Sequence, residues 1–209
     1  MNTKPMKTEA QEMRRFVVCI DNGHGKNTPG KCSPDKTIWV WEWNREVAKI
    51  VCEMLQRKNI DARLIVKEDY DVSLTERCRR VNAIYEAVGK KNCICLSVHI
   101  NAARGDGNWS NARGYSVFVS EKNASERSKR LAKCIEDVAL ERGHKGNRSV
   151  PSCHYWQKDL KILRSTNCPA VLCENLFMDN KLDCAYLLTQ EGKEEMATVM
   201  CQGILNYIG

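Results

Sequence analysis

Residues 93–99 read Cys-Ile-Cys-Leu-Ser-Val-His, an unbroken run of mostly apolar residues that ends in a histidine. Such runs are typical of strands buried on both faces of a parallel sheet, because helices cover each side of that kind of sheet. A polar, glycine-bearing stretch at 102–114 follows. The run therefore predicts a central strand with His99 at its carboxyl end.

Strands and helices are predicted to alternate on both sides of this run. Apolar residues at helical spacing predict helices, and shorter apolar runs predict further strands. The polar stretch 143–158 is expected to be a loop. The alternation predicts one α/β domain over residues 15–209, with a mostly parallel twisted sheet, helices on both faces and an active site at the carboxyl ends of the strands. Residues 1–14 are expected to form a flexible basic segment. The expected helices cover about 42–58, 73–89, 123–143 and 196–204, and the other strands about 16–21, 62–66, 115–120 and 170–174.

Composition narrows the class of protein. The chain has 209 residues, 43% of them hydrophobic and 28% charged, which excludes a disordered or collagen-like chain. There is no apolar run of about 18 residues, the length that a membrane span needs. The first fifteen residues lack the apolar core of a secretory signal, so we expect synthesis in the cytoplasm. The net charge of +7 favours an anionic partner.

Twelve cysteines invite a disulfide or metal interpretation. No Cys-x-x-Cys pair is present, and most of the cysteines fall within apolar runs or on apolar helix stripes. They are therefore expected to be small buried side chains with free thiols. Cys32, Cys153 and Cys168 lie in loop-like stretches and are the exceptions to this placement.

Three side chains able to carry chemistry stand at or just beyond strand ends. His24 follows the first strand after a glycine turn, His99 ends the central strand and Glu174 ends the run Pro169–Glu174. A lone histidine is usually a satisfied structural residue, but the carboxyl ends of parallel strands meet at one edge of the sheet. The pattern therefore predicts that two imidazoles and a carboxylate come together there.

A catalytic zinc site requires three protein ligands and one open position. With His24 and His99 as two ligands, Glu42 is the candidate third, at the head of a predicted helix. Glu46, one turn further on, is the rival, and Glu42 could equally be an acidic residue favoured by the helix dipole. Glu42 lies among Trp39, Trp41 and Trp43, which could stack on substrate at the rim or pack in the core.

Five motifs in order resemble the zinc-dependent N-acetylmuramoyl-L-alanine amidases of the type 3 amidase family, over roughly residues 16–207. Gly-His-Gly alone would be a weak signal, whereas the ordered set is specific. The residues that carry the resemblance are Asp21-Asn-Gly-His-Gly25, Glu42 with Val47, Ser73-Leu-Thr-Glu-Arg77, Ser97-Val-His-Ile-Asn-Ala102, and Leu163-Arg164 followed by Pro169-Ala-Val-Leu-Cys-Glu174 with Phe177 and Asn180.

The resemblance implies one Zn²⁺ per chain, bound by His24, Glu42 and His99, with Glu174 as catalytic base and acid. It implies hydrolysis of the amide between N-acetylmuramic acid and L-alanine in peptidoglycan. Peptidoglycan is then the partner rather than nucleic acid, and a monomer is expected. Two departures from the family pattern are Asn22, where proline is common, and Asn175 beside the catalytic glutamate. By motif position, the substrate contacts would be Asn101, Arg164 and Asn175.

Other functions remain open at this stage. A module that binds muropeptide without cutting it, and a zinc amidohydrolase of a small amide or peptide, are both compatible with the same fold. A bare basic domain suits a phage-like endolysin or a cellular cell-wall enzyme that reaches the wall by release or export.

Overall fold

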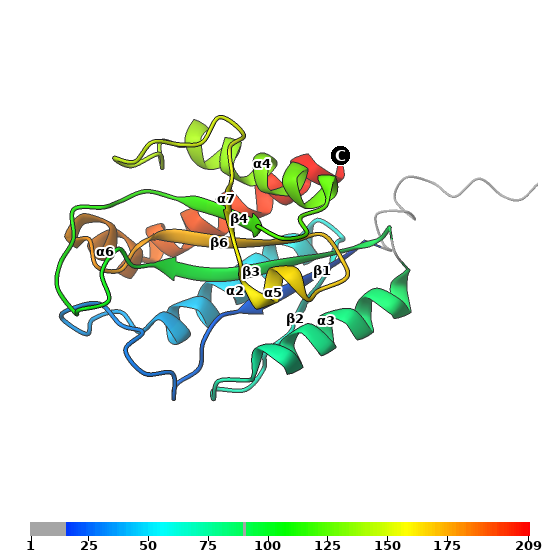
Figure 1. Cartoon of the computed structure of the whole chain (residues 1–209), viewed down its shortest axis with the longest axis horizontal. Helices are drawn as coiled ribbons and strands as arrows, with labels where there is room; N and C mark the ends of the chain where they lie inside the picture. Colours follow the sequence, from blue (N-terminus) through cyan, green and yellow to red (C-terminus); the bar gives the residue numbers. More distant parts are fainter. Residues whose placement is uncertain (1–15, 90) are drawn as a thin grey trace, which may run out of the picture.

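The computed structural model describes residues 16–89 and 91–209, so the predicted segment 1–14 lies outside the described residues. Its strands form one six-stranded sheet in the order β2-β1-β3-β6-β4-β5 (Figure 1). The elements in chain order are β1 (Val17–Asn22), α2 (Val40–Arg57), β2 (Asp61–Leu64), α3 (Leu74–Val88), β3 (Cys93–Asn101), β4 (Ser116–Ser120), α4 (Glu126–Glu141), β5 (Trp156–Lys158), α5 (Lys161–Arg164), β6 (Ala170–Phe177), α6 (Lys181–Leu188) and α7 (Gln190–Ile208).

The predicted α/β fold is confirmed, with the run at 93–99 as a central strand. β1 pairs in parallel with β2 and β3, and β3 pairs in parallel with β6. β4 runs antiparallel to β6, so the sheet is mostly rather than wholly parallel. The expectation of a loop over 143–158 was wrong for Trp156–Lys158, a three-residue strand that pairs with β4. Three residues are too few to show a strand period in the sequence.

Alternate residues of the strands point into two separate apolar layers. Val18 and Ile20 of β1 belong to the larger layer, under α2, α4 and α7, whereas Val17 and Cys19 face the smaller layer under α3 and α5. Figure 1 shows α4 and α3 on opposite sides of the sheet. The predicted cover of helices on both faces is therefore confirmed.

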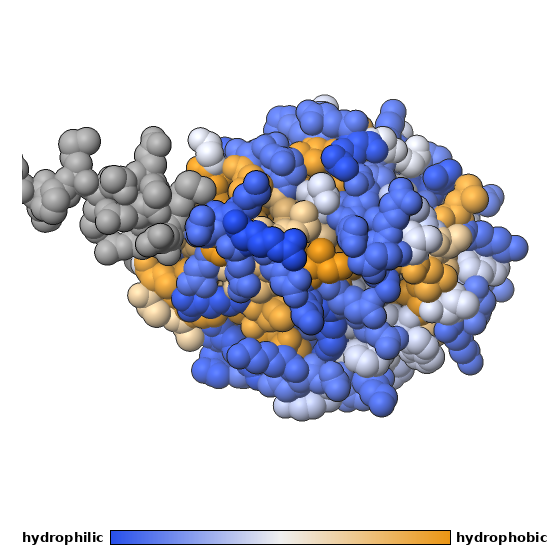
Figure 2. Space-filling model, turned by 180° about the vertical axis from the view of Figure 1, so that it is seen from behind, coloured by the Kyte–Doolittle hydropathy of each residue, from blue (hydrophilic) through white to orange (hydrophobic). Residues whose placement is uncertain are grey.

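The outer surface is mostly polar. Figure 2 shows one face on which hydrophilic side chains predominate and apolar ones emerge in small groups between them. Among the described residues, no helix is both long enough and apolar enough to cross a membrane.

Candidate functional site

His24 and His99 lie against each other at the carboxyl ends of β1 and β3. Their rings meet edge to face, with centroids 4.9 Å apart and planes at 80°. Gly23 makes this approach possible, since a Cβ atom there would lie 2.2 Å from the Nε2 atom of His99. His24 itself has a φ of 64°, in the left-handed region that non-glycine residues rarely adopt. The turn after β1 therefore holds His24 in a conformation that the surrounding structure has to maintain.

Arg77 of α3 maintains that turn. Its buried guanidinium donates to the carbonyl oxygens of Asn22 at 2.7 Å and His24 at 3.0 Å, and to the carboxylates of Asp21 at 2.8 Å and Asp71 at 2.9 Å. The rigid fork of an arginine can satisfy such a set of acceptors at once, which a lysine cannot. Arg77 was noted only as part of a motif in the sequence. Its role in holding the His24 turn depends on the packing of α3 against that turn, which the sequence alone does not show.

Burial keeps both imidazoles neutral. It lowers the pKa of His24 to about 4, and it lowers the pKa of His99 well below the ordinary value. The nearby ammonium of Lys31 lowers the pKa of both histidines further. A neutral imidazole has one nitrogen lone pair that can bind a metal or accept a hydrogen bond. The two residues can therefore act as ligands or as proton acceptors.

Glu174 pairs with His99 in the register between β3 and β6, which places its carboxyl group on the same edge of the sheet. Its Oε2 atom is buried and has no hydrogen-bond partner. Burial raises the pKa of Glu174 to about 7, because the charged form loses its hydration. A carboxyl group with that pKa can both take up and release a proton near neutral pH, as a general acid–base catalyst must.

Glu42 does not accompany the two histidines. It is exposed on α2, and the rival Glu46 pairs with Lys193 of α7. Within residues 16–89 and 91–209, no group of three or more histidine, cysteine, aspartate or glutamate side chains is placed to hold a metal ion. The two neutral imidazoles suit zinc, but the expected set of three ligands is not assembled.

The expected substrate contacts have local partners. The side chain of Asn101 accepts from the backbone N–H of Ala102 at 2.9 Å, and Arg164 pairs with Asp159. Asn175 is fully buried, and its Nδ2 atom donates to the carbonyl of His99 at 2.9 Å. The structure thus assigns Asn175 a role in fixing β6 beside His99. Of the three, only Asn175 contacts a residue of the candidate site.

A cavity of about 330 Å³ adjoins the histidine pair. The segment before α3 and the first turn of that helix form its far wall, which includes Asp71 and Leu74. Leu74 and neighbouring Tyr70 are large apolar side chains that remain 48% and 58% exposed. The cavity itself therefore combines the exposed apolar side chain of Leu74 and two neutral imidazoles with the charged groups of Asp21, Asp71 and Arg77.

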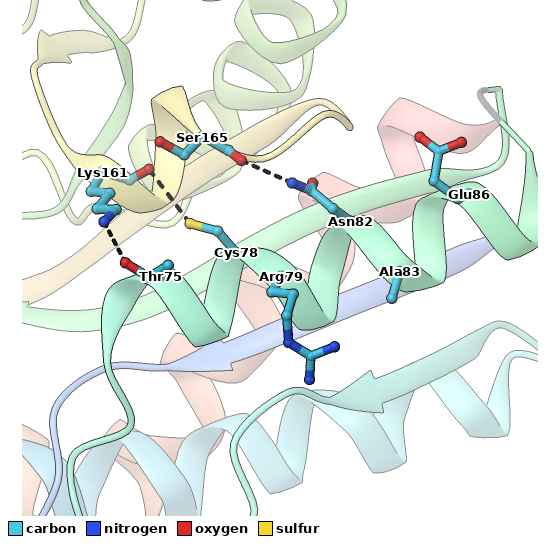
Figure 3. Close-up of a pocket in the computed structure, with 8 residues that line it drawn as sticks. All are labelled: Thr75, Cys78, Arg79, Asn82, Ala83, Glu86, Lys161 and Ser165. Atoms are coloured by element: carbon cyan, nitrogen blue, oxygen red, sulfur yellow. Dashed lines mark hydrogen bonds between the residues drawn. The ribbon is translucent and has the colours of Figure 1, made fainter.

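A larger hollow of about 520 Å³ lies between α3 and α5 (Figure 3). Its polar groups pair with one another across the seam: Lys161 Nζ donates to Thr75 Oγ1, Cys78 Sγ to the Lys161 carbonyl and Asn82 Nδ2 to the Ser165 carbonyl. No residue predicted for the site lines this hollow. The hollow therefore follows the contact between α3 and α5, and these hydrogen bonds join the two helices.

The sequence pattern of the N-acetylmuramoyl-L-alanine amidases matches residues 18–206, and the chain belongs to this family. It is 29% identical over 192 residues to the endolysin of Bacillus phage SPP1, and the match covers 90% of this chain and 64% of that protein. It is 23% identical over 193 residues to the probable cell wall amidase LytH of Staphylococcus epidermidis, covering 91% of this chain and 58% of that protein. The chain thus spans about three-fifths of the length of these two relatives.

Solved structures share the fold. The N-acetylmuramyl-L-alanine amidase Ami1 from Mycobacterium smegmatis superposes with a TM-score of 0.80 at 18% identity, covering 93% of this chain and 97% of that one. The N-acetylmuramoyl-L-alanine amidase from Clostridium difficile 630 gives a TM-score of 0.76 at 23% identity, covering 92% and 96%. The agreement extends over nearly the whole of both chains, so the described sheet and helices form the common architecture.

Proposed function

We propose that this chain hydrolyses peptidoglycan at the amide bond between N-acetylmuramic acid and L-alanine. The observation that carries the proposal is the protonatable carboxyl group of Glu174 beside the His24–His99 pair, in a chain of the amidase family. The SPP1 relative is named an endolysin, and the LytH relatives are named probable cell wall amidases. The net charge of +7 suits an anionic wall polymer.

In the proposed reaction, ionised Glu174 takes a proton from the water that attacks the lactyl carbonyl carbon. A C–O bond forms, the C–N bond breaks, and the same carboxyl group returns the proton to the departing alanine nitrogen. His24 and His99 stay neutral and offer lone pairs at the site, while Arg77 holds the turn that carries His24. Zinc is the cofactor that the resemblance implies, and no step is assigned to it because only two of its three expected ligands come together.

We propose that the substrate is the cell wall, reached after synthesis in the cytoplasm by release or export, and that the chain acts as a monomer. The cavity beside the histidines, with Leu74 in its wall, is the part of the surface that we assign to the substrate.

The test is digestion of purified sacculi. The chain should release free alanine amino groups without new reducing sugar ends, and Glu174→Gln should lower that rate by a factor of about 100 or more, the scale of general acid–base catalysis. Glu141→Gln, at an exposed position of α4, is the matched control and should keep full activity. Cleavage of peptide cross-links with intact muramoyl-alanine bonds would instead indicate a peptidase.

A second function, binding of muropeptide without cleavage, is favoured by one observation, namely the absence of a three-ligand metal group in the described residues. Sedimentation of the chain with sacculi, without release of amino groups even when zinc is added, would support this second function over hydrolysis. Activity on a short soluble amide but not on sacculi would point to an amidohydrolase of small substrates.

A further inference from the structure

We infer that Arg148 and Lys158 form a subsite for a carboxylate group in the peptide portion of the substrate, beside Glu174 and on the same face of the sheet. The inference rests on the proposed function, which supplies the identity of the substrate. Neither Arg148 nor Lys158 is among the site residues predicted from the sequence. Both belong to the segment 143–158, which the sequence predicted to be a loop.

The register of three strands places Glu174 and the subsite on one face. Ser116 of β4 pairs with Glu174 of β6, and two residues further along β4 Phe118 pairs with Trp156 of β5. Partners in register, and residues two apart along a strand, point to the same face of a sheet. The rings of Phe118 and Trp156 agree with this, since their centroids lie 6.1 Å apart. Lys158 is two residues beyond Trp156 and therefore shares the face.

Arg148 is held on this face by two aromatic rings and a hydroxyl group. Its guanidinium carbon lies 5.2 Å from the centre of the Trp156 ring and 4.8 Å from the centre of the Phe177 ring. Its Nη2 atom donates to the hydroxyl of Ser116, the register partner of Glu174. A planar guanidinium that stacks on rings has a fixed orientation, so little side-chain entropy is lost when it binds a ligand.

Both cations keep binding capacity that the chain does not use. The Nε atom of Arg148 has no hydrogen-bond partner in the part of the chain that the structure describes. Lys158 is exposed, its ammonium lies 6.0 Å from the centre of the Phe118 ring, and the neighbouring Asp159 pairs with two other basic side chains. Burial raises the pKa of Glu174, and the charges of Lys158 and Arg148 oppose that rise, so both cations lie within electrostatic reach of Glu174. The pair therefore offers a ligand two positive charges beside the proposed base.

The reach of the substrate fits this spacing. Neighbouring strands are about 4.8 Å apart, so β4 and β5 lie about 5 and 10 Å from the strand that carries Glu174. One residue of an extended peptide spans about 3.5 Å, so the carboxyl groups of the residue after L-alanine lie about 7 Å from the amide that is cleaved. A carboxylate there reaches the subsite while the amide stays at Glu174. A guanidinium and an ammonium both form charge-assisted hydrogen bonds with a carboxylate, which a carboxamide cannot match.

The test compares the affinities of two probes for the full chain carrying Glu174→Gln, which removes the proposed base so that the probes stay intact. One probe is N-acetylmuramoyl-L-alanyl-D-glutamate, and the other is the same compound with both glutamate carboxyl groups amidated. Calorimetry should show that the dianionic probe binds more tightly by at least about 10-fold, the scale of one hydrogen bond to a charged group. Adding Arg148→Gln should reduce the ratio of the two affinities to below about 3, and adding Lys158→Gln should reduce it by about 2- to 5-fold.

The ratio separates ligand binding from a purely structural role, because a distorted site loses affinity for both probes alike. Arg148→Lys should keep part of the discrimination. Lys49→Gln makes the same change of charge as Lys158→Gln at an exposed position of α2, on the other face of the sheet, and should keep all of it.

Equal affinities for the two probes in the Glu174→Gln chain would overturn the inference, and so would a lack of measurable binding of the dianionic probe. An unchanged ratio in a folded Arg148→Gln variant would do the same. If Arg148→Gln fails to fold, Lys158→Gln at its exposed position decides the matter by the same ratio. A chain that shows the expected ratio but does not digest sacculi would count against the proposed function and leave this inference standing.

Discussion

The guanidinium of Arg77 and the carboxylate of Asp21 form an ion pair of 2.8 Å in which the two side chains are only 1% and 2% exposed. Asp21 is further fixed by the hydroxyl of Ser97, which donates to its Oδ2 atom at 2.6 Å. The pair joins α3, β1 and β3 directly beneath the His24 turn. The geometry of the candidate site therefore depends on a buried charge pair whose two residues also line the cavity beside the histidines.

Arg77→Lys is expected to destabilise the fold by about 1–3 kcal/mol for each buried acceptor that loses its donor. An ammonium cannot reach the carbonyls of Asn22 and His24 together with the carboxylate of Asp21, so buried acceptors lose their donors. Guanidinium denaturation measures the change.

Arg79→Lys is the control on the same helix. Arg79 is exposed and pairs with Glu76 one turn away, so its substitution should change stability by less than about 0.5 kcal/mol. Equal stabilities for the Arg77 and Arg79 variants would contradict the role assigned to the buried pair.

Glu136 of α4 predicts a pH dependence of stability away from the site. It is 1% exposed, its Oε2 atom accepts from the N–H of Val117 at 3.1 Å, and burial raises its pKa to about 8. Between about pH 4.5 and pH 8 the unfolded chain releases this proton while the folded chain keeps it. This carboxyl group therefore lowers the free energy of unfolding as pH rises through that range, and its contribution levels off above about 8.

Glu136→Gln removes this titration. Relative to the native chain, the variant should gain stability from pH 4 to pH 8 by a few kcal/mol, since one pKa unit corresponds to about 1.4 kcal/mol. Urea denaturation at several pH values measures the difference, with exposed Glu141→Gln as a control that should show no such trend. A pH-independent difference between Glu136→Gln and the native chain would refute the prediction.

The tryptophans around Glu42 have separate roles. Trp43 is buried, and its Nε1 atom donates to the carbonyl of Leu187 at 2.8 Å, whereas Trp39 is 39% exposed. Trp43→Phe should therefore cost about 1–3 kcal/mol, because it leaves a buried carbonyl unpaired. Trp39→Phe should cost less than about 0.5 kcal/mol. Chemical denaturation of the two variants compares them directly, and a larger loss for Trp39 would reverse the assignment.

The fold could be predicted from the sequence because each central strand is a continuous apolar run. The runs at 93–99 and 170–174 correspond to β3 and β6, the pair whose register places Glu174 opposite His99. The antiparallel direction of β4 could not be predicted. The composition of the loop 102–114 shows that the chain turns, but not that the strand after it runs back against its neighbour. The short β5 and α5 form through tertiary contacts, which leave no period in the sequence.

Glu42, the expected third ligand, shows why part of the site could not be predicted from the sequence. His24 and His99 are placed by strand ends, which a sequence reveals, and the structure brings them together. The direction of a side chain on a helix depends on how the helix is rotated about its own axis. Near the first turn of α2, tryptophans at alternate positions prevent the sequence from showing which face of the helix points inward. Two contacts hold α2 against the turn after β1, from Asn44 Nδ2 to the Gly23 carbonyl and from Arg45 Nη1 to the His24 carbonyl, and no motif links the residues that they join.

The last prediction concerns the cysteines, which the sequence predicted to be free thiols. All twelve are free in the structure, and nine are buried; Cys32 and Cys134 are partly exposed and Cys153 is exposed. Cys168 lies in the loop before β6, as predicted, but it is buried and packs into the layer under α3 and α5. Burial also raises the pKa of Cys173 and Cys201 to about 12, which leaves little thiolate to react at neutral pH.

Alkylation of the native protein, followed by mass spectrometry, should therefore label Cys153 first. Cys32 and Cys134 should follow more slowly, and the buried thiols should react only when the chain opens. Denatured protein prepared without reductant should take up twelve labels. Fewer labels, restored by a reductant, would show that disulfides form, and one candidate pair is Cys19 and Cys93, whose sulfur atoms lie 3.7 Å apart on neighbouring strands. Cys93→Ser would then raise the number of labels on Cys19, whereas Cys153→Ser would not.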